Sequence, residues 1–165
     1  MDAEFFRTMF DYSFWARDRL LKAAEGISEE DYARQNGFST YGSIRSILHH
    51  TLASEGNYLR RWLGEEGAAP KEDELPTVEA VTAYWAQQEA KLRSYVGGLS
   101  NADVDREIVT PRRSGGEFRR PLWQDLVQII NHGTQHRSEA AEALTQAGRS
   151  PGNLDSSVYF QEKSA

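Results

Sequence analysis

The chain has 165 residues, a net charge of −6, 39% hydrophobic and 11% aromatic residues, and no cysteine. The length suits one hydrophobic core, so we expect a single domain over residues 1–165. The acidic balance argues against nucleic acid or an anionic membrane as the main partner. The absence of cysteine excludes disulfides, a cysteine nucleophile and thiolate ligands from the protein. No apolar run approaches the roughly 20 residues of a membrane span, and the charged N-terminal segment is unlike a signal peptide, so we expect a cytoplasmic protein.

Apolar residues recur every three to four positions in four long segments, which is the spacing of helices that bury one face. These segments are residues 3–25, 43–63, 77–97 and 121–147. Thr77 stands where a side chain can cap a helix start, and Gly64 where a helix ends. Pro121 stands where the first turn of a helix accepts proline. The pattern predicts an all-α protein built as a four-helix bundle.

Each predicted helix carries one tryptophan, which we expect to anchor the core. The four residues are Trp15, Trp62, Trp85 and Trp123. Between the first two helices, Ser28 predicts a cap followed by a short helical turn. Beyond Pro151, the tail keeps Tyr159 and Phe160, so part of it is expected to pack back on the helices.

A small hairpin is predicted directly before the fourth helix. Residues 106–110 and 117–120 flank the turn sequence Ser114-Gly115-Gly116. Four arginines cluster around this hairpin: Arg112, Arg113, Arg119 and Arg120. They are interpreted either as a solvated turn or as an anion clamp for a carboxylate-bearing thiol or substrate.

The four histidines occur as two pairs. His132 and His136 are four residues apart, so on a helix they lie one turn apart on the same face and can bind one metal ion. The alternative is that they are two ordinary helix histidines. His49 and His50 are adjacent on the second helix and could supply a third ligand. Helical periodicity leaves the choice between them open, although the small serines beside His50 leave space for a pocket.

Two well-known helical metal sites do not match this pattern. Di-iron bundles use Glu-x-x-His pairs, and no histidine of this chain has glutamate three positions before it. Zinc proteases place a glutamate directly after the first histidine of the helix, and that position is Gly133 here. A zinc peptidase is therefore not expected.

With these residues in view, the chain resembles the DinB-like superfamily (damage-inducible DinB, YfiT-like), a group of small bacterial metal-binding four-helix bundles. The resemblance covers nearly the whole chain. Its most specific part is the run Asn131-His132-Gly133-Thr134-Gln135-His136-Arg137. It also includes Phe14-Trp15-Ala16, the second helix from Ser43 to Glu55, Pro121-Leu122-Trp123, and Pro151 with Leu154-Asp155.

The resemblance implies a ligand set. In the family, one histidine of the second helix and two of the fourth bind a divalent metal. The second-helix ligand is commonly followed five residues later by an acidic or polar residue, and Glu55 is five residues after His50. The resemblance therefore implies His50, His132 and His136 as metal ligands, with His49 outside the site.

Three further side chains stand at positions from which they could orient a ligand imidazole through its second nitrogen. Glu139 follows His136 by three residues, and Gln128 precedes His132 by four. Glu55 could do the same for His50. For each of these three residues, a role in an ordinary polar network or on the surface is the alternative.

Three neutral imidazoles leave at least one coordination position open, which is typical of a catalytic rather than a structural site. Water in that position would have its pKa lowered toward neutrality, and a small-molecule thiol would be held as thiolate. Imidazole suits zinc, nickel and iron. The family includes relatives that use bacterial thiols such as bacillithiol or mycothiol. The resemblance therefore implies a thiol-dependent S-transferase that acts on a small molecule with a low-molecular-weight thiol cosubstrate.

Three other interpretations remain open. The protein could be a metal-dependent hydrolase, or a metal-binding stress-response protein without catalytic activity. It could also be a helical bundle that self-associates, with incidental histidines. The resemblance further implies a homodimer, because family members often pair through their helices.

Overall fold

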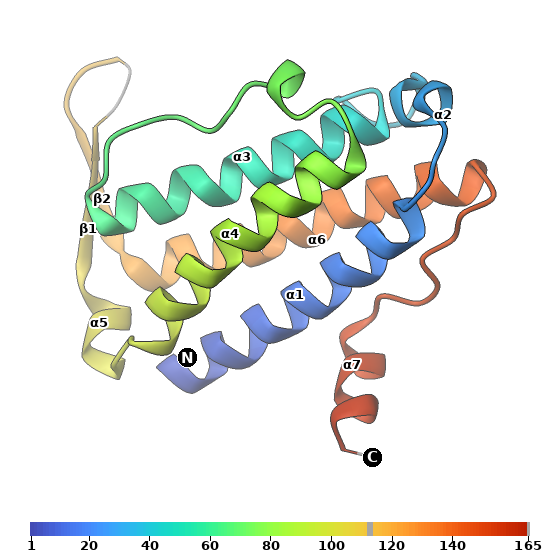
Figure 1. Cartoon of the computed structure of the whole chain (residues 1–165). Helices are drawn as coiled ribbons and strands as arrows, with labels where there is room; N and C mark the ends of the chain where they lie inside the picture. Colours follow the sequence, from blue (N-terminus) through green and yellow to red (C-terminus); the bar gives the residue numbers. More distant parts are fainter. Residues whose placement is uncertain (112–113, 165) are drawn as a thin grey trace.

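The computed structural model describes residues 1–111 and 114–164, and it is mostly helical with one two-stranded sheet (Figure 1). The long helices are α1 (Ala3–Ala24), α3 (Ile44–Leu63), α4 (Val78–Gly97) and α6 (Leu122–Gln146). The shorter elements are α2 (Glu29–Ala33), the 3₁₀ turn η1 (Glu72–Glu74), α5 (Asn101–Asp105), β1 (Glu107–Pro111), β2 (Glu117–Pro121) and α7 (Ser156–Lys163). All four predicted long helices and the hairpin are present.

Side-chain caps begin three of the long helices. Asp2, Ser43 and Thr77 each accept a hydrogen bond from a backbone N–H three residues further on, which satisfies an N–H that the helix itself leaves unpaired. At the other end of α3, Gly64 adopts a left-handed conformation with φ 68°. Pro121 was expected in the first turn of α6, but it is the residue before the helix and also the last residue of β2.

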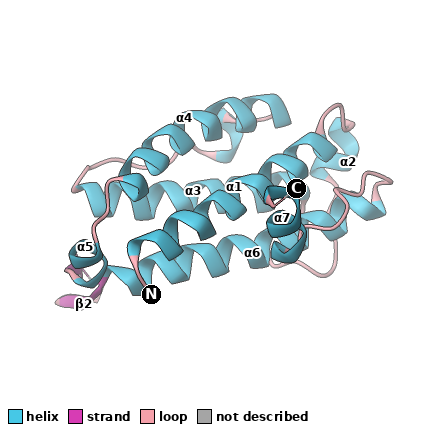
Figure 2. Cartoon of the chain, turned by 90° about the horizontal axis from the view of Figure 1, so that it is seen from below, coloured by secondary structure: helices cyan, strands magenta, loops and turns pink. Residues whose placement is uncertain are grey.

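The long helices pack in a closed arrangement: α1 packs on α4 and α6, and α3 packs on the same two helices (Figures 1 and 2). The connection from α3 to α4 runs back along α3, and Arg45 at the start of α3 donates to the backbone carbonyl of Glu72 at 3.1 Å. Consequently α3 and α4 run in the same direction. None of the described helices is both long and apolar enough to cross a membrane.

Two apolar clusters fill the space between these helices. One contains Trp85 and lies toward the α2 end, and the other contains Phe6 and lies toward the hairpin. The expectation for the four tryptophans was only half right. Trp62 and Trp85 are buried, whereas Trp15 and Trp123 are half-buried at the edges of the core.

The C-terminal tail packs back through α7. Tyr159 is buried against Tyr12 and Trp15 of α1, and Trp15 donates its indole N–H to Glu162 at 2.9 Å. Phe160, by contrast, is exposed. The tail therefore covers the outer face of α1. Trp15 lies at the edge of the core because it packs against this tail.

Candidate metal centre

Three histidines from two helices meet at one point. His50 comes from α3, and His132 and His136 come from α6. The Nε2 atoms of His50 and His132 are 3.0 Å apart, and one ligand nitrogen from each of the three residues lies within 4.8 Å of the other two. The three residues could therefore hold a metal ion.

The packing of α3 on α6 decides which histidine of the second helix joins the group. His50 faces α6, with its ring 4.8 Å from that of His136. His49 turns to the connection between α3 and α4, where its Nε2 lies 2.8 Å from the carbonyl oxygen of Pro70. His49 therefore contacts the loop that runs back along α3, and it does not belong to the histidine group.

An aromatic residue from the loop before α3 forms one wall of the site. The Tyr41 ring stacks on His50 at 3.8 Å with an interplanar angle of 19°, and it meets the edge of His136 at 5.2 Å. Gly42 has φ 78°, and a Cβ there would lie 2.2 Å from the side-chain oxygen of Gln35. The left-handed conformation favours glycine here, and the turn at Gly42 directly follows Tyr41. Sequence reasoning missed Tyr41 because a loop has no hydrophobic periodicity.

A chain of hydrogen bonds orients His136 from behind. His136 Nδ1 lies 2.9 Å from Glu139 Oε2, and Ser39 Oγ donates to the same oxygen at 2.9 Å. The backbone N–H of Tyr41 donates to Ser39 Oγ at 3.2 Å. A carboxylate on Nδ1 selects the tautomer that carries its proton there, so Nε2 of His136 is left as the acceptor facing the other histidines. Ser39, like Tyr41, was not anticipated from the sequence.

The electrostatics of the site favour neutral imidazoles. Burial, followed by the neighbouring charges of His132 and His136, lowers the pKa of His50 from 6.5 to about 4. Burial and then His136 also lower the pKa of His132. Burial alone would raise the pKa of Glu139, but the hydrogen bonds from His136 and Ser39 outweigh it and lower that pKa. Unprotonated imidazoles are the form that binds a metal, and an ionised Glu139 is the form that can hold the Nδ1 proton of His136.

The donor set fits a divalent metal. Two nitrogens that bind one ion at about 2.0–2.1 Å lie about 2.8–3.4 Å apart for bond angles of about 90–109°, and the His50–His132 separation of 3.0 Å falls within this range. In addition, Nδ1 of His132 is buried without a hydrogen-bond partner in the described part of the chain, so the described contacts of His132 are made through Nε2. His50 and His132 are half-buried rather than fully enclosed, which leaves a path to solvent.

The other two residues considered as orienting groups lie elsewhere. Glu55 is half-buried, and its Oε1 accepts a hydrogen bond from the indole N–H of Trp85 at 2.9 Å. Gln128 is exposed on α6. Glu139 is thus the residue of the three for which the structure shows a direct contact with a histidine of the group.

The hairpin arginines are engaged with carboxylates of their own region. Arg119 forms ion pairs of 2.7 Å with both Glu107 and Glu117, and Arg120 pairs with the buried carboxylate of Asp125. Arg112 and Arg113 lie outside the described residues. An anion clamp here therefore stays a prediction, and it would need Arg119 and Arg120 to exchange their present partners.

The sequence was also compared with known proteins. The DinB family matches residues 1–164. Protein DinB of Bacillus subtilis (strain 168) is 22% identical over 164 residues, which is 96% of this chain and 95% of that protein. With a match over essentially its whole length, and with three histidines gathered between α3 and α6, this chain belongs to the DinB family.

Proposed function

We propose that the chain forms a single DinB-type four-helix bundle that binds one divalent metal ion, zinc, nickel or iron, through His50, His132 and His136. The observation that carries the proposal is the convergence of three ligand nitrogens within 4.8 Å, with no carboxylate among them. Because all three ligands are neutral, the ion would keep its double charge and an open coordination position, as in catalytic sites.

The reaction that we propose is a thiol-dependent S-transfer to a small molecule. When bound, the metal would stabilise a low-molecular-weight thiol as its thiolate, which is the nucleophilic form. The protein's own part is to hold the three imidazoles in place: Tyr41 supports His50 by stacking, and Glu139 holds the Nδ1 proton of His136. Because His50 and His132 are only half-buried, a cosubstrate could approach the proposed metal from their exposed side.

Two alternatives use the same site. A hydrolase would place water where the thiol is proposed, with its pKa lowered by the metal. A non-catalytic metal-binding protein of a stress response would hold the ion without turnover. The cavity that touches His132 has room for only about 10 Å³ of water, so a thiol must bind on the exposed side of the histidines.

We extend the proposal to assembly and location. We propose a homodimer in the cytoplasm, which acts on a small-molecule substrate without nucleic acid or membrane as partners. Light scattering tests the assembly: a dimer has twice the 18.7 kDa of the chain, and a particle of 18.7 kDa at working concentration would contradict the proposal.

The proposed function is tested on protein purified without a histidine tag. Elemental analysis is expected to find one divalent metal per chain. Assays with a panel of low-molecular-weight thiols and an electrophilic acceptor should then show metal-dependent consumption of a thiol. Metal without thiol consumption, but with hydrolysis of an ester or amide panel, would favour the hydrolase. Absence of metal, together with no uptake of added Zn²⁺ or Ni²⁺, would refute the metal site itself.

A further inference from the structure

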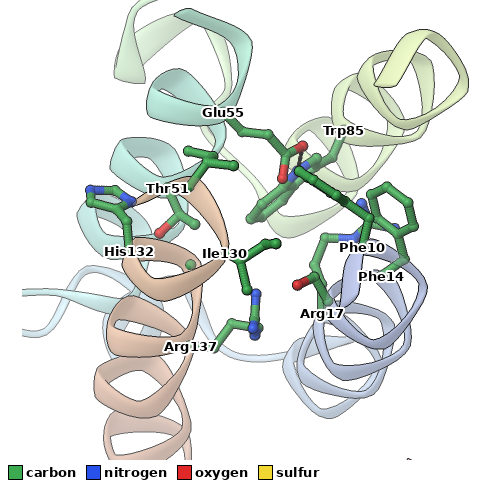
Figure 3. A pocket seen from close by; sticks show the side chains of 12 residues that line it. Phe10, Phe14, Arg17, Thr51, Glu55, Trp85, Ile130, His132 and Arg137 are labelled. Atoms are coloured by element: carbon green, nitrogen blue, oxygen red, sulfur yellow. Dashed lines mark hydrogen bonds between the residues drawn. The ribbon is translucent and has the colours of Figure 1, made fainter. Parts of the chain in front are cut away.

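A second polar cluster lies inside the molecule behind His132. Arg17 of α1, Glu55 of α3 and Arg137 of α6 surround a small cavity together with the indole of Trp85 (Figure 3). Arg17 is only 4% exposed and Arg137 only 8%, whereas Glu55 is half-buried. We refer to Arg17, Glu55 and Arg137 as the arginine–glutamate cluster. His132 lines the same cavity, so this cluster adjoins the histidine group through one shared residue.

The members of the cluster are held firmly. Arg17 donates to Glu89 and to Asp18, the latter at 2.7 Å, and Arg137 donates to Thr134 Oγ1 at 2.9 Å. The guanidinium of Arg137 folds over Gly133, where a Cβ would lie 2.8 Å from its Nη1. Gly133 thus provides the space in which Arg137 lies beside the ligand helix.

Three polar atoms of residues that line this cavity are buried and have no partner among the described residues: Ser13 Oγ, Arg17 Nη1 and His132 Nδ1. A buried polar atom without a partner costs about 1–3 kcal/mol, and three around one cavity call for a common explanation. The cavity offers about 10 Å³ to water, close to the space of one water molecule. A single water with two to four polar neighbours is the ordinary solution for such a site.

We infer that one buried water joins His132 Nδ1 to the carboxylate of Glu55, and that Glu55 is a positioning residue for this metal ligand. The water accepts the Nδ1–H of His132 and donates to Glu55, whose oxygens can accept more than the one bond from Trp85. Arg17 Nη1 and Ser13 Oγ complete its neighbours. This inference rests on the proposed function only in that it treats His132 as a ligand.

The consequence is a fixed tautomer. With its proton held on Nδ1, His132 presents the lone pair of Nε2 to the histidine group, as His136 does through Glu139. In the metal-free protein, the 3.0 Å contact between the Nε2 atoms of His50 and His132 then requires His50 to donate and His132 to accept. The two histidines of α6 are oriented by two different carboxylates, one directly and one through water.

The test follows the ring nitrogens of His132 in metal-free protein by ¹⁵N NMR at neutral pH, so it does not depend on any activity. Wild type is expected to show the proton on Nδ1. Glu55→Leu should remove this preference, and Glu55→Gln should partly restore it because its amide oxygen can still accept. The matched control is Glu89→Leu, which also removes a carboxylate partner of Arg17 but does not line the cavity. It should leave the tautomer of His132 unchanged.

Three results would overturn the inference: a proton on Nε2 in wild type, no change in Glu55→Leu, or equal changes in Glu55→Leu and Glu89→Leu. If Glu55→Leu does not fold, Ser13→Val decides, because its added methyl groups occupy the space of the water without removing a hydrogen bond of the described structure. An unchanged tautomer in Ser13→Val would then overturn it. Competition with a chelator for Zn²⁺ should show a loss of about 10-fold in affinity for Glu55→Leu. Failure of wild type to bind Zn²⁺ would refute the proposed function, while the NMR result decides the inference separately.

Discussion

The histidine group lies between α3 and α6, and the arginine–glutamate cluster lies beside it among α1, α3 and α6. Both are polar, yet they differ in how their charges are satisfied. Burial alone would lower the pKa of Arg17, but Asp18, Glu55 and Glu89 outweigh it and raise that pKa, so the protein supplies its own counter-charges. In the histidine group, His50 and His132 have lowered pKa values, and the ligand nitrogens face one another. The converging ligand nitrogens could therefore be completed by a metal ion. In the cluster, Arg17 is compensated by its carboxylates, whereas burial raises the pKa of Glu55 and lowers that of Arg137.

Arg17→Met gives the largest expected effect and tests the stabilising side of this comparison. The change leaves the carboxylates of Glu55 and Glu89 without their buried cation, so we expect a loss of about 3–5 kcal/mol in the free energy of unfolding. Urea unfolding followed by circular dichroism measures it. Arg93→Met is the control, because Arg93 binds the same Glu89 from a half-exposed position, and its loss should cost less than about 1 kcal/mol. Equal losses in the two variants would show that the burial of Arg17 does not increase its contribution to the free energy of unfolding.

His49 and His50 of α3 test the metal-binding side of this comparison. His50→Ala should weaken metal binding by more than about 100-fold, because it removes a ligand and not merely a residue that orients one. His49→Ala should keep the metal, since the side chain of His49 contacts Pro70 instead of the histidine group. Metal content after dialysis and chelator competition measure both. Loss of metal in His49→Ala with retention in His50→Ala would reverse the proposed ligand set.

Acid should separate the two regions. In the unfolded chain, histidine has a pKa of about 6.5, whereas burial, His132 and His136 lower that of folded His50 to about 4. As the pH falls from about 6.5 to about 4, the unfolded chain takes up protons that His50 in the folded metal-free protein does not, so its stability declines through this window. Protons also compete with the metal, while the apolar core is unaffected. A falling pH series, or a chelator, is therefore expected to remove metal before helicity, and simultaneous loss of both would mean a structural metal.

Gly133→Ala gives the smallest expected effect and tests the seam between the two regions. Alanine usually stabilises a helix by about 1 kcal/mol over glycine. At this position, its Cβ would lie 2.8 Å from Nη1 of the buried Arg137, so we expect a net loss of about 1 kcal/mol instead. Gly97→Ala is the control, because nothing lies within 4 Å of a Cβ there. Thermal unfolding compares them, and an equal gain in both variants would show that Arg137 moves away freely.

Much of the fold could be predicted because it follows from local patterns. Apolar periodicity and the cap at Thr77 placed the long helices within one or two residues, and the glycine-rich turn predicted the hairpin. The short helices α5 and α7 were not predicted as helices. Both have fewer than nine residues, too short for a clear periodic signal, and α7 gains its stability by packing Tyr159 on α1.

The sequence by itself determined that His132 and His136 share one face of α6, because spacing along a helix fixes direction around its axis. It could not choose between His49 and His50, since both lie off the main apolar stripe and the choice depends on where α6 crosses α3. Only the tertiary structure placed Tyr41 and Ser39 beside the histidine group. It also decided that Glu55 accepts a hydrogen bond from Trp85. These contacts join residues far apart in the chain, and helix packing, which no local pattern encodes, decides them.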